Sequence, residues 1–262
     1  MSTNAGQIVV WCGVITAHTS SLFRAFASMQ PVESLFVSWR SEDSVRRLQK
    51  WPVDEAEGLC HIGLSGQSRL IRAISIFLGC RQKTHIFCSP FDSFQSLLIL
   101  IFSVVLSGGP VFIMVESYNN QRLGCFGESD VWSGLKNICR PAVYKILYGF
   151  LASRISGVLA ISELARRQLI RAGVDPNKII RFAYFVPSKI CGPKDLRRGT
   201  SDAVLRVAYV GRPDPVKGSQ LAIDSVIRAI ECGAHIELTA FGPGDWRHLN
   251  FDRYNIKYGG LI

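Results

Sequence analysis

The sequence predicts an α/β protein with a larger parallel-sheet domain followed by a smaller, partial one. Short apolar runs rich in β-branched residues alternate with longer stretches of helical periodicity, which is typical of parallel sheets covered by helices on both faces. The 262 residues leave room for one or two domains. A polar segment at 188–203, with Gly, Pro and charged residues, separates two such alternations and is the expected interdomain linker.

The first domain, residues 1–187, should alternate strands and helices throughout. Apolar runs predict strands at 8–14, 35–37, 84–88, 111–115, 157–161 and 178–182, with a further short strand near 59–62. Periodicity predicts helices at 20–29, 41–50, 69–78, 94–106 and 140–155. Ser162 is a good N-cap and Gly173 a good C-terminal stop, so we expect another helix between them.

Two of these helices have unusual patterns. Residues 94–106 are the most apolar stretch, but a transmembrane helix needs about 20 apolar residues. We therefore expect a buried crossover helix, with shallow membrane insertion as the alternative. In 140–155, Arg140, Lys145 and Arg154 lie outside an apolar stripe, as in an amphipathic helix. The stripe consists of Val143, Ile146, Leu147, Phe150, Leu151 and Ile155.

Charge and cysteine usage limit the classes of partner and cofactor. The net charge is +10, and residues 136–181 hold nine Lys or Arg against Glu163 and Asp175, which suits an anionic membrane surface or a phosphate-bearing substrate. No recognition motif accompanies the charge, so we expect no nucleic-acid partner. The eight cysteines are scattered without ligand spacing, so we expect no metal and a reducing, cytoplasmic location. No G-x-G-x-x-G follows a predicted strand, which disfavours an oxidoreductase.

The second domain, residues 204–262, begins with a strand–helix–strand unit. Strands are expected at 205–210 and 236–241, with a helix between Gly218 and Gly233. A unit of this length gives parallel strands, and ligands of such sheets bind beyond their carboxyl ends. Arg212, Lys217 and the helix N-terminus would meet there and suit a phosphate group. The alternative is a loop with two solvated cations.

The run GRPDPVKG, followed by a helix and a strand that ends in FGPGD, resembles family 4 glycosyltransferases, which have the GT-B fold of two Rossmann-like domains. LAISELARRQLIRAGVDPNKIIRFAYFVP in the first domain resembles the same family. The resemblance implies a donor site for a nucleotide diphosphate sugar and a partial second Rossmann-like domain. The implied donor-binding residues are Gly211, Arg212, Lys217 and Gly218 in the first motif, and Gly242 and Gly244 in the second.

The resemblance also implies an activity. It implies transfer of a sugar, with retention of configuration and without a metal or cofactor, to a glycan or lipid-linked acceptor. The natural setting is the synthesis of cell-surface polysaccharide or lipopolysaccharide at the inner face of the cell membrane. A non-catalytic nucleotide-binding or membrane-docking module with the same fold is the alternative.

On the acceptor side, three residues are candidates, and no residue is assigned to catalysis. His18 follows the first strand, Glu116 follows the strand at 111–115, and Ser162 follows the strand at 157–161. Each could contact the acceptor from the carboxyl edge of the sheet. The alternatives are a loop histidine without a role, a solvated carboxylate and a simple N-cap.

The second domain of this chain departs from the family pattern. In the family, the second domain is longer and carries an E-x7-E stretch near the donor sugar, whereas residues 204–262 contain no such stretch. We expect a truncated chain without transfer activity of its own.

Overall fold

The computed structural model describes residues 7–15, 19–22, 24–25, 33–39, 59–66, 68–118, 131–183, 204–213, 217–242, 244–246 and 254–260. The chain divides into two compact units, one comprising Met1–Tyr118 with Cys139–Ser188 and the other the remainder. The helix predicted at 41–50, half of the one at 20–29 and the linker at 188–203 lie outside the described residues.

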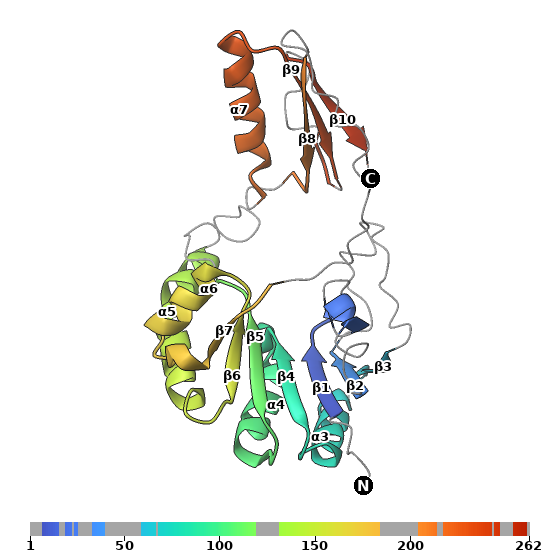
Figure 1. The fold of residues 1–262 in the computed structure, drawn as a ribbon, viewed down its shortest axis with the longest axis vertical. Helices are drawn as coiled ribbons and strands as arrows, with labels where there is room; N and C mark the ends of the chain where they lie inside the picture. Colours follow the sequence, from blue (N-terminus) through green and yellow to red (C-terminus); the bar gives the residue numbers. More distant parts are fainter. Residues whose placement is uncertain are drawn as a thin grey trace. The chain divides into compact units, whose positions relative to one another are not determined.

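A seven-stranded parallel sheet forms the larger unit (Figure 1). Its strands are β1 (Gln7–Cys12), β2 (Glu33–Ser38), β3 (Cys60–Gly63), β4 (Thr84–Cys88), β5 (Val111–Val115), β6 (Gly157–Ala160) and β7 (Ile179–Arg181). The order is β3-β2-β1-β4-β5-β6-β7, so the chain reverses its direction across the sheet between β1 and β4. The predicted parallel α/β architecture is confirmed. Ligands of such sheets bind at the reversal point, outside the carboxyl ends of the strands.

Strand alternation places the two cores of this sheet on opposite faces. On β1, Val9 and Trp11 belong to one core, whereas Val10 and Cys12 belong to the other. The first core also receives buried side chains from α3 (Arg69–Gly79), α4 (Phe94–Leu106), α5 (Val131–Leu151) and α6 (Glu163–Arg171). Short 3-10 turns, η1 (Pro90–Asp92) and η2 (Pro176–Lys178), complete the described elements of this unit.

The structure corrects the predicted buried side of α5. The helix begins at Val131, well before residue 140, and Pro141 lies inside it. Tyr148 and Leu151 are buried, whereas Ile146 is 74% exposed. The reason is aromatic packing: Phe91 of η1 lies 5.6 Å from the Tyr148 ring and turns that side of the helix inward. The predicted stripe is therefore split between the core and the surface.

A second correction concerns α4, which was expected to be buried. It does cross from β4 to β5 over the sheet, and Ser93 caps its N-terminus by accepting from the Ser96 N–H at 3.1 Å. Only one side is covered, however, because Phe94 is 74% and Val105 58% exposed. Within the described residues, no helix is both long and apolar enough to cross a membrane.

The smaller unit is a three-stranded parallel sheet in the order β10-β9-β8. Its elements are β8 (Leu205–Val210), α7 (Ser219–Glu231), β9 (Ile236–Phe241) and β10 (Ile256–Gly260). The predicted strand–helix–strand unit is confirmed. Val226 of α7 packs with Leu238, Ala240, Trp246 and Ile256 in its core.

Candidate functional site

The strands of the smaller unit end at one edge, where the loops that follow them are in contact. Gly211, directly after β8, donates its N–H to the carbonyl of Phe241 at 2.9 Å. Gly242, directly after β9, donates to the carbonyl of Gly260 at 3.0 Å. Because ligands of parallel α/β sheets bind beyond the carboxyl ends of the strands, this edge is the candidate donor site.

Contact between the loops explains two of the predicted glycines. Gly242 has φ 136°, and a Cβ atom there would overlap the carbonyl oxygen of Gly211. Gly244 has φ 129°, and a Cβ atom there would lie 2.6 Å from Cδ of Pro213. Both positions therefore require glycine for conformation and for space. The structure brings the two predicted motifs together.

The loop after β8 also carries the predicted cationic groups. Arg212 is half-buried and Lys217 is exposed, and both precede the first turn of α7. Gly218, with φ 69°, occupies the N-cap position without a side-chain cap. The first amides of a helix have no intrahelical partner, and the helix dipole adds partial positive charge there. One short loop thus presents a guanidinium, an ammonium and a helix N-terminus, which together suit a phosphate group.

Tyr209 holds the two ends of this loop together. Its hydroxyl lies 3.2 Å from the carbonyl oxygen of Arg212 and 3.1 Å from that of Lys217, so it can donate to either. The ring lies under the loop, because a Cβ atom on Gly211 would approach the Tyr209 hydroxyl to 2.9 Å. Tyr209 therefore fixes the backbone from which both cationic side chains project.

Two further aromatic residues fix the loop after β9. Trp246 Nε1 and the Tyr258 hydroxyl each donate to the carbonyl of Gly242 at 3.0 Å. The Trp246 ring centroid lies 5.8 Å from that of Tyr258 and 5.7 Å from that of Tyr209. The three rings form an aromatic support, Tyr209–Trp246–Tyr258, beneath both donor loops.

Sequence reasoning missed the aromatic support, although a signal was present. Tyr209 lies two positions before Gly211, and Tyr258 two positions before Gly260. Residues two apart on a strand share a face, so the Tyr209 hydroxyl lies under the turn that Gly211 begins, whereas the Tyr258 hydroxyl reaches Gly242 after the neighbouring strand β9.

Two of the three acceptor-side candidates lie within the described residues of the larger unit. His18 lies outside the described residues. Glu116 is exposed and directly follows β5, and Ser162 begins α6 after β6. Because Val115 of β5 pairs with Ala160 of β6, Glu116 and Ser162 leave neighbouring strands at the same edge. The Ser162 hydroxyl accepts from the backbone N–H of Ala165 at 3.0 Å, which confirms the predicted N-cap.

Gln168 of α6 clamps the segment that carries Glu116. Its Oε1 accepts from the Tyr118 N–H at 3.0 Å, and its Nε2 donates to the Tyr118 carbonyl at 2.9 Å. Gln168 is buried, which strengthens the consequence of losing either bond. Sequence reasoning did not identify this clamp, because a glutamine in a polar helix gives no periodic signal.

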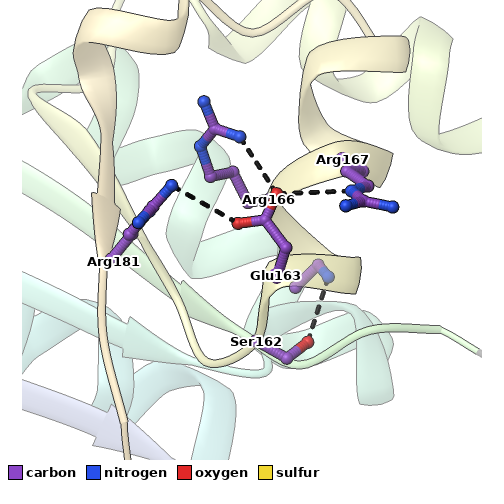
Figure 2. A network of polar contacts seen from close by, with 6 residues as sticks. Ser162, Glu163, Arg166, Arg167 and Arg181 are labelled. Carbon is purple, nitrogen blue, oxygen red and sulfur yellow. Dashed lines mark hydrogen bonds and ion pairs between the residues drawn. The ribbon is translucent and has the colours of Figure 1, made fainter.

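A cluster of arginines surrounds Glu163 at the start of α6 (Figure 2). Glu163 Oε1 accepts from Arg166 at 3.2 Å and from Arg167 at 3.3 Å, and Oε2 lies 3.8 Å from Arg181 Nη2. Desolvation raises the pKa of the carboxyl, but the hydrogen bond from Arg167 and the neighbouring cationic charges outweigh it and hold the pKa below its ordinary value. One carboxylate cannot balance three guanidinium groups, so this edge keeps an excess of positive charge.

The remaining polar groups of the larger unit do not form a metal centre in the part of the chain that the structure describes. No three His, Cys, Asp or Glu side chains lie together there in a way that could hold an ion. His85 is fully buried and hydrogen-bonded on both ring nitrogens, to Trp11 Nε1 and to the Cys80 carbonyl, each at 3.1 Å. Its role is therefore to satisfy polar groups within the core.

Comparison with solved structures finds several proteins of the same fold. The lipopolysaccharide outer core galactosyltransferase WaaB, in its apo form, aligns with a TM-score of 0.58 and 14% identity over 98% of this chain and 68% of that one. Anabaena HepE in complex with UDP aligns with a TM-score of 0.60 and 11% identity over 98% and 69%. S. aureus MnaA with UDP aligns with a TM-score of 0.51 and 8% identity over 98% of this chain and 69% of that one.

These comparisons show the fold of the chain, which is the Rossmann-like α/β fold of GT-B glycosyltransferases. No family model and no curated protein matches the sequence. The narrower resemblance to family 4 therefore depends on the sequence alone, that is, on the two donor motifs and on residues 159–187.

Proposed function

We propose that the protein is a glycosyltransferase that binds a nucleotide diphosphate sugar and moves the sugar to a glycan or lipid-linked acceptor. The observation that carries this proposal is the junction of the two donor loops, where Gly242 fits against Gly211 without room for a side chain. The N-terminus of α7 follows the first of these loops, and its first amides would bind the diphosphate there.

In this proposal each group at the edge has a chemical role. Arg212 binds diphosphate oxygens through its planar fork, and Lys217 supplies a point charge. Gly211, Gly242 and Gly244 let the two loops and Tyr209 pack together, and Gly218 begins α7 from the left-handed region, so that the backbone groups of these glycines would meet the diphosphate. As the bond to the sugar breaks, negative charge grows on the leaving diphosphate. Preorganised cations and helix amides stabilise that charge most strongly in the transition state.

The acceptor and the cellular setting form a narrower part of the proposal. HepE binds UDP and WaaB is a lipopolysaccharide galactosyltransferase, which support a nucleotide sugar donor and an acceptor in cell-surface polysaccharide or lipopolysaccharide synthesis. Glu116 and Ser162 would meet the acceptor, with His18 as a third candidate. Retention of configuration, independence of metals and cofactors, and membership of family 4 follow from the motif resemblance.

We further propose that the protein works at the cytoplasmic face of an anionic membrane. The stretch 136–181 holds nine basic residues against two acidic ones, and three of the arginines gather around Glu163. Each basic residue near an anionic surface contributes about 1 kcal/mol of attraction, which salt screens.

A transfer assay tests the proposed activity against the non-catalytic alternative. The purified chain is incubated with UDP- and GDP-sugars and with glycolipids extracted from bacterial membranes, and products are identified by mass spectrometry. A mass increase of one sugar unit supports a transferase. Binding of the nucleotide without any transfer agrees with the expectation that this chain has no transfer activity of its own, and it supports a nucleotide-binding module.

A further inference from the structure

The outer sides of α3, α4 and α5 expose large apolar side chains. These helices cover the same face of the seven-stranded sheet, because each contributes buried side chains to one core. The exposed fraction of these apolar residues lies between 36% and 74%. They include Ile71, Phe94, Phe102, Val105, Ile146 and Phe150. We call this surface the α3–α5 face.

Helix α4 leaves large apolar side chains exposed to water although two serines are buried beneath it. Its buried side consists of Ile99 and Leu100 together with Ser96 and Ser103, and its exposed side carries Phe94 and Phe102. The Ser103 hydroxyl has no hydrogen-bond partner among the described residues. A helix on a wetted surface turns its apolar side inward and its hydroxyls outward. The arrangement of α4 instead fits an apolar environment on the outside.

The same is true of α5. Tyr148 and Leu151 fill the core, while Val143, Ile146 and Phe150 repeat along the opposite side at intervals of three and four residues. This spacing forms a continuous apolar ridge on one face of a helix. The ridge is the part of the predicted stripe that the core does not use.

The charged residues within the helices of the α3–α5 face are basic and lie on α3 and α5, because α4 contains no charged residue. None of the three helices contains Asp or Glu. Exposed basic residues lie within or just beyond them, including Arg72, Arg81, Lys145 and Arg154. The Arg154 guanidinium carbon lies 4.7 Å from the Phe150 ring centroid, so a cation sits directly beside the ridge. Such side chains reach lipid phosphates while apolar neighbours enter the acyl boundary.

A surface with apolar and cationic groups and no acidic ones matches an anionic bilayer, which offers phosphates above hydrocarbon. The 13-residue α4 is too short to span, since a bilayer needs about 20 apolar residues. A helix of this kind lies in the interface.

We propose that the α3–α5 face inserts shallowly into an anionic lipid bilayer. This identifies the surface that meets the membrane in the proposed function, and it does not depend on nucleotide binding. Electrostatic attraction brings the face to the membrane, and apolar insertion adds a part that salt does not screen.

Vesicle flotation of the full chain tests the proposal. The probes are vesicles of phosphatidylcholine with and without phosphatidylglycerol, each at low and high salt. The test variant combines Phe102→Ser, which removes an exposed apolar side chain from α4, with Ile146→Ser, which interrupts the ridge on α5. The control is Leu221→Ser on α7, which removes a side chain that is 71% exposed. Circular dichroism and a UDP titration on the same samples show whether fold and donor site are intact.

The wild type and the control should float with anionic vesicles and remain partly bound at high salt. The double variant should keep its fold and lose about tenfold or more in partition coefficient, most clearly at high salt. Equal flotation of the double variant and the control would overturn the proposal, and so would wild-type binding that salt abolishes completely. If the wild type does not float but forms a dimer that the double substitution dissociates, the α3–α5 face mediates self-association and the proposal is overturned. Failure of UDP to bind while flotation is normal would refute the donor site only.

Discussion

Gly242 carries the strongest steric requirement of the donor edge. Its φ of 136° and its contact with the Gly211 carbonyl both exclude a side chain. We expect Gly242→Ala to lower the free energy of unfolding by about 1–3 kcal/mol. It should also weaken UDP binding at least tenfold, because the loops must separate. Urea denaturation and calorimetry measure the two effects.

Gly149→Ala is the control for that substitution. Gly149 lies within α5, and a Cβ atom there would meet nothing within 4 Å. Alanine in a helix interior is favoured over glycine by roughly 0.5–1 kcal/mol, so this variant should be slightly more stable and bind UDP normally. Unchanged binding by Gly242→Ala would contradict the steric account.

His85 makes the stability of the larger unit dependent on pH. Burial lowers its pKa from 6.5 to about 4 in the folded protein. Between these values the unfolded chain binds a proton that the folded chain does not, so stability falls as pH falls through this window. The pKa difference corresponds to a loss of about 3 kcal/mol once the pH is below 4, at 1.36 kcal/mol per pKa unit.

Urea denaturation between pH 7 and pH 4 tests this prediction. His85→Gln removes the imidazole, so the variant should be less stable at pH 7 but should lose much less stability on acidification. The same pH dependence in both proteins would show that other groups determine acid unfolding.

At the scale of elements, the loop between β8 and α7 depends on a single hydroxyl at its base. Tyr209→Phe keeps the ring against Trp246 but removes the donor to the Arg212 and Lys217 carbonyls. We expect UDP affinity to fall about three- to tenfold, with a loss of about 1 kcal/mol in the free energy of unfolding. Binding of uridine, which lacks phosphates, should change much less.

Tyr254→Phe is the matched control, because its hydroxyl bonds Glu231 at 3.1 Å, at the C-terminal end of α7. The control should lose similar stability without losing UDP affinity. If both variants lose affinity equally, the hydroxyl of Tyr209 has no specific role in the loop.

Elements were predictable where local signals agreed. The strands β4, β5, β8 and β9 and the helix α4 have the predicted bounds, because each apolar run has glycine, proline or serine next to at least one of its ends. The buried sides of α4 and α5 were not predictable, because both helices are apolar on more than one side. Contacts with Phe91 and the sheet decide which side turns inward.

At the scale of the whole molecule, the sequence predicted which two motifs meet at one edge of the smaller sheet but not what supports them. Parallel strands necessarily bring Gly211 and Gly242 to one edge, so their contact follows from topology. Strand periodicity indicates on which face Tyr209 and Tyr258 lie, but it does not pair Tyr209 with Trp246 or Gln168 with Tyr118, because these partners belong to different segments of the chain.

In the proposed reaction, the two units of the fold have different roles. The smaller unit carries the donor loops, and the larger unit carries Glu116, Ser162 and the α3–α5 face. A transferase needs its donor and its acceptor held in the correct orientation for reaction. In the proposed function, each Rossmann-like unit binds one of the two at the carboxyl edge of its sheet.

The central claim, that the joined loops bind a nucleoside diphosphate, is tested most directly by calorimetric titration of UDP. The titration compares the wild type with Arg212→Ala and with Arg206→Ala. Arg206 is an exposed arginine of β8 that lies 3.7 Å from Glu237 and outside the loop, which makes it a matched control. We predict saturable binding to the wild type and the control, and a loss of at least tenfold for Arg212→Ala. Equal affinity in all three proteins, or no binding by the wild type, would contradict the account.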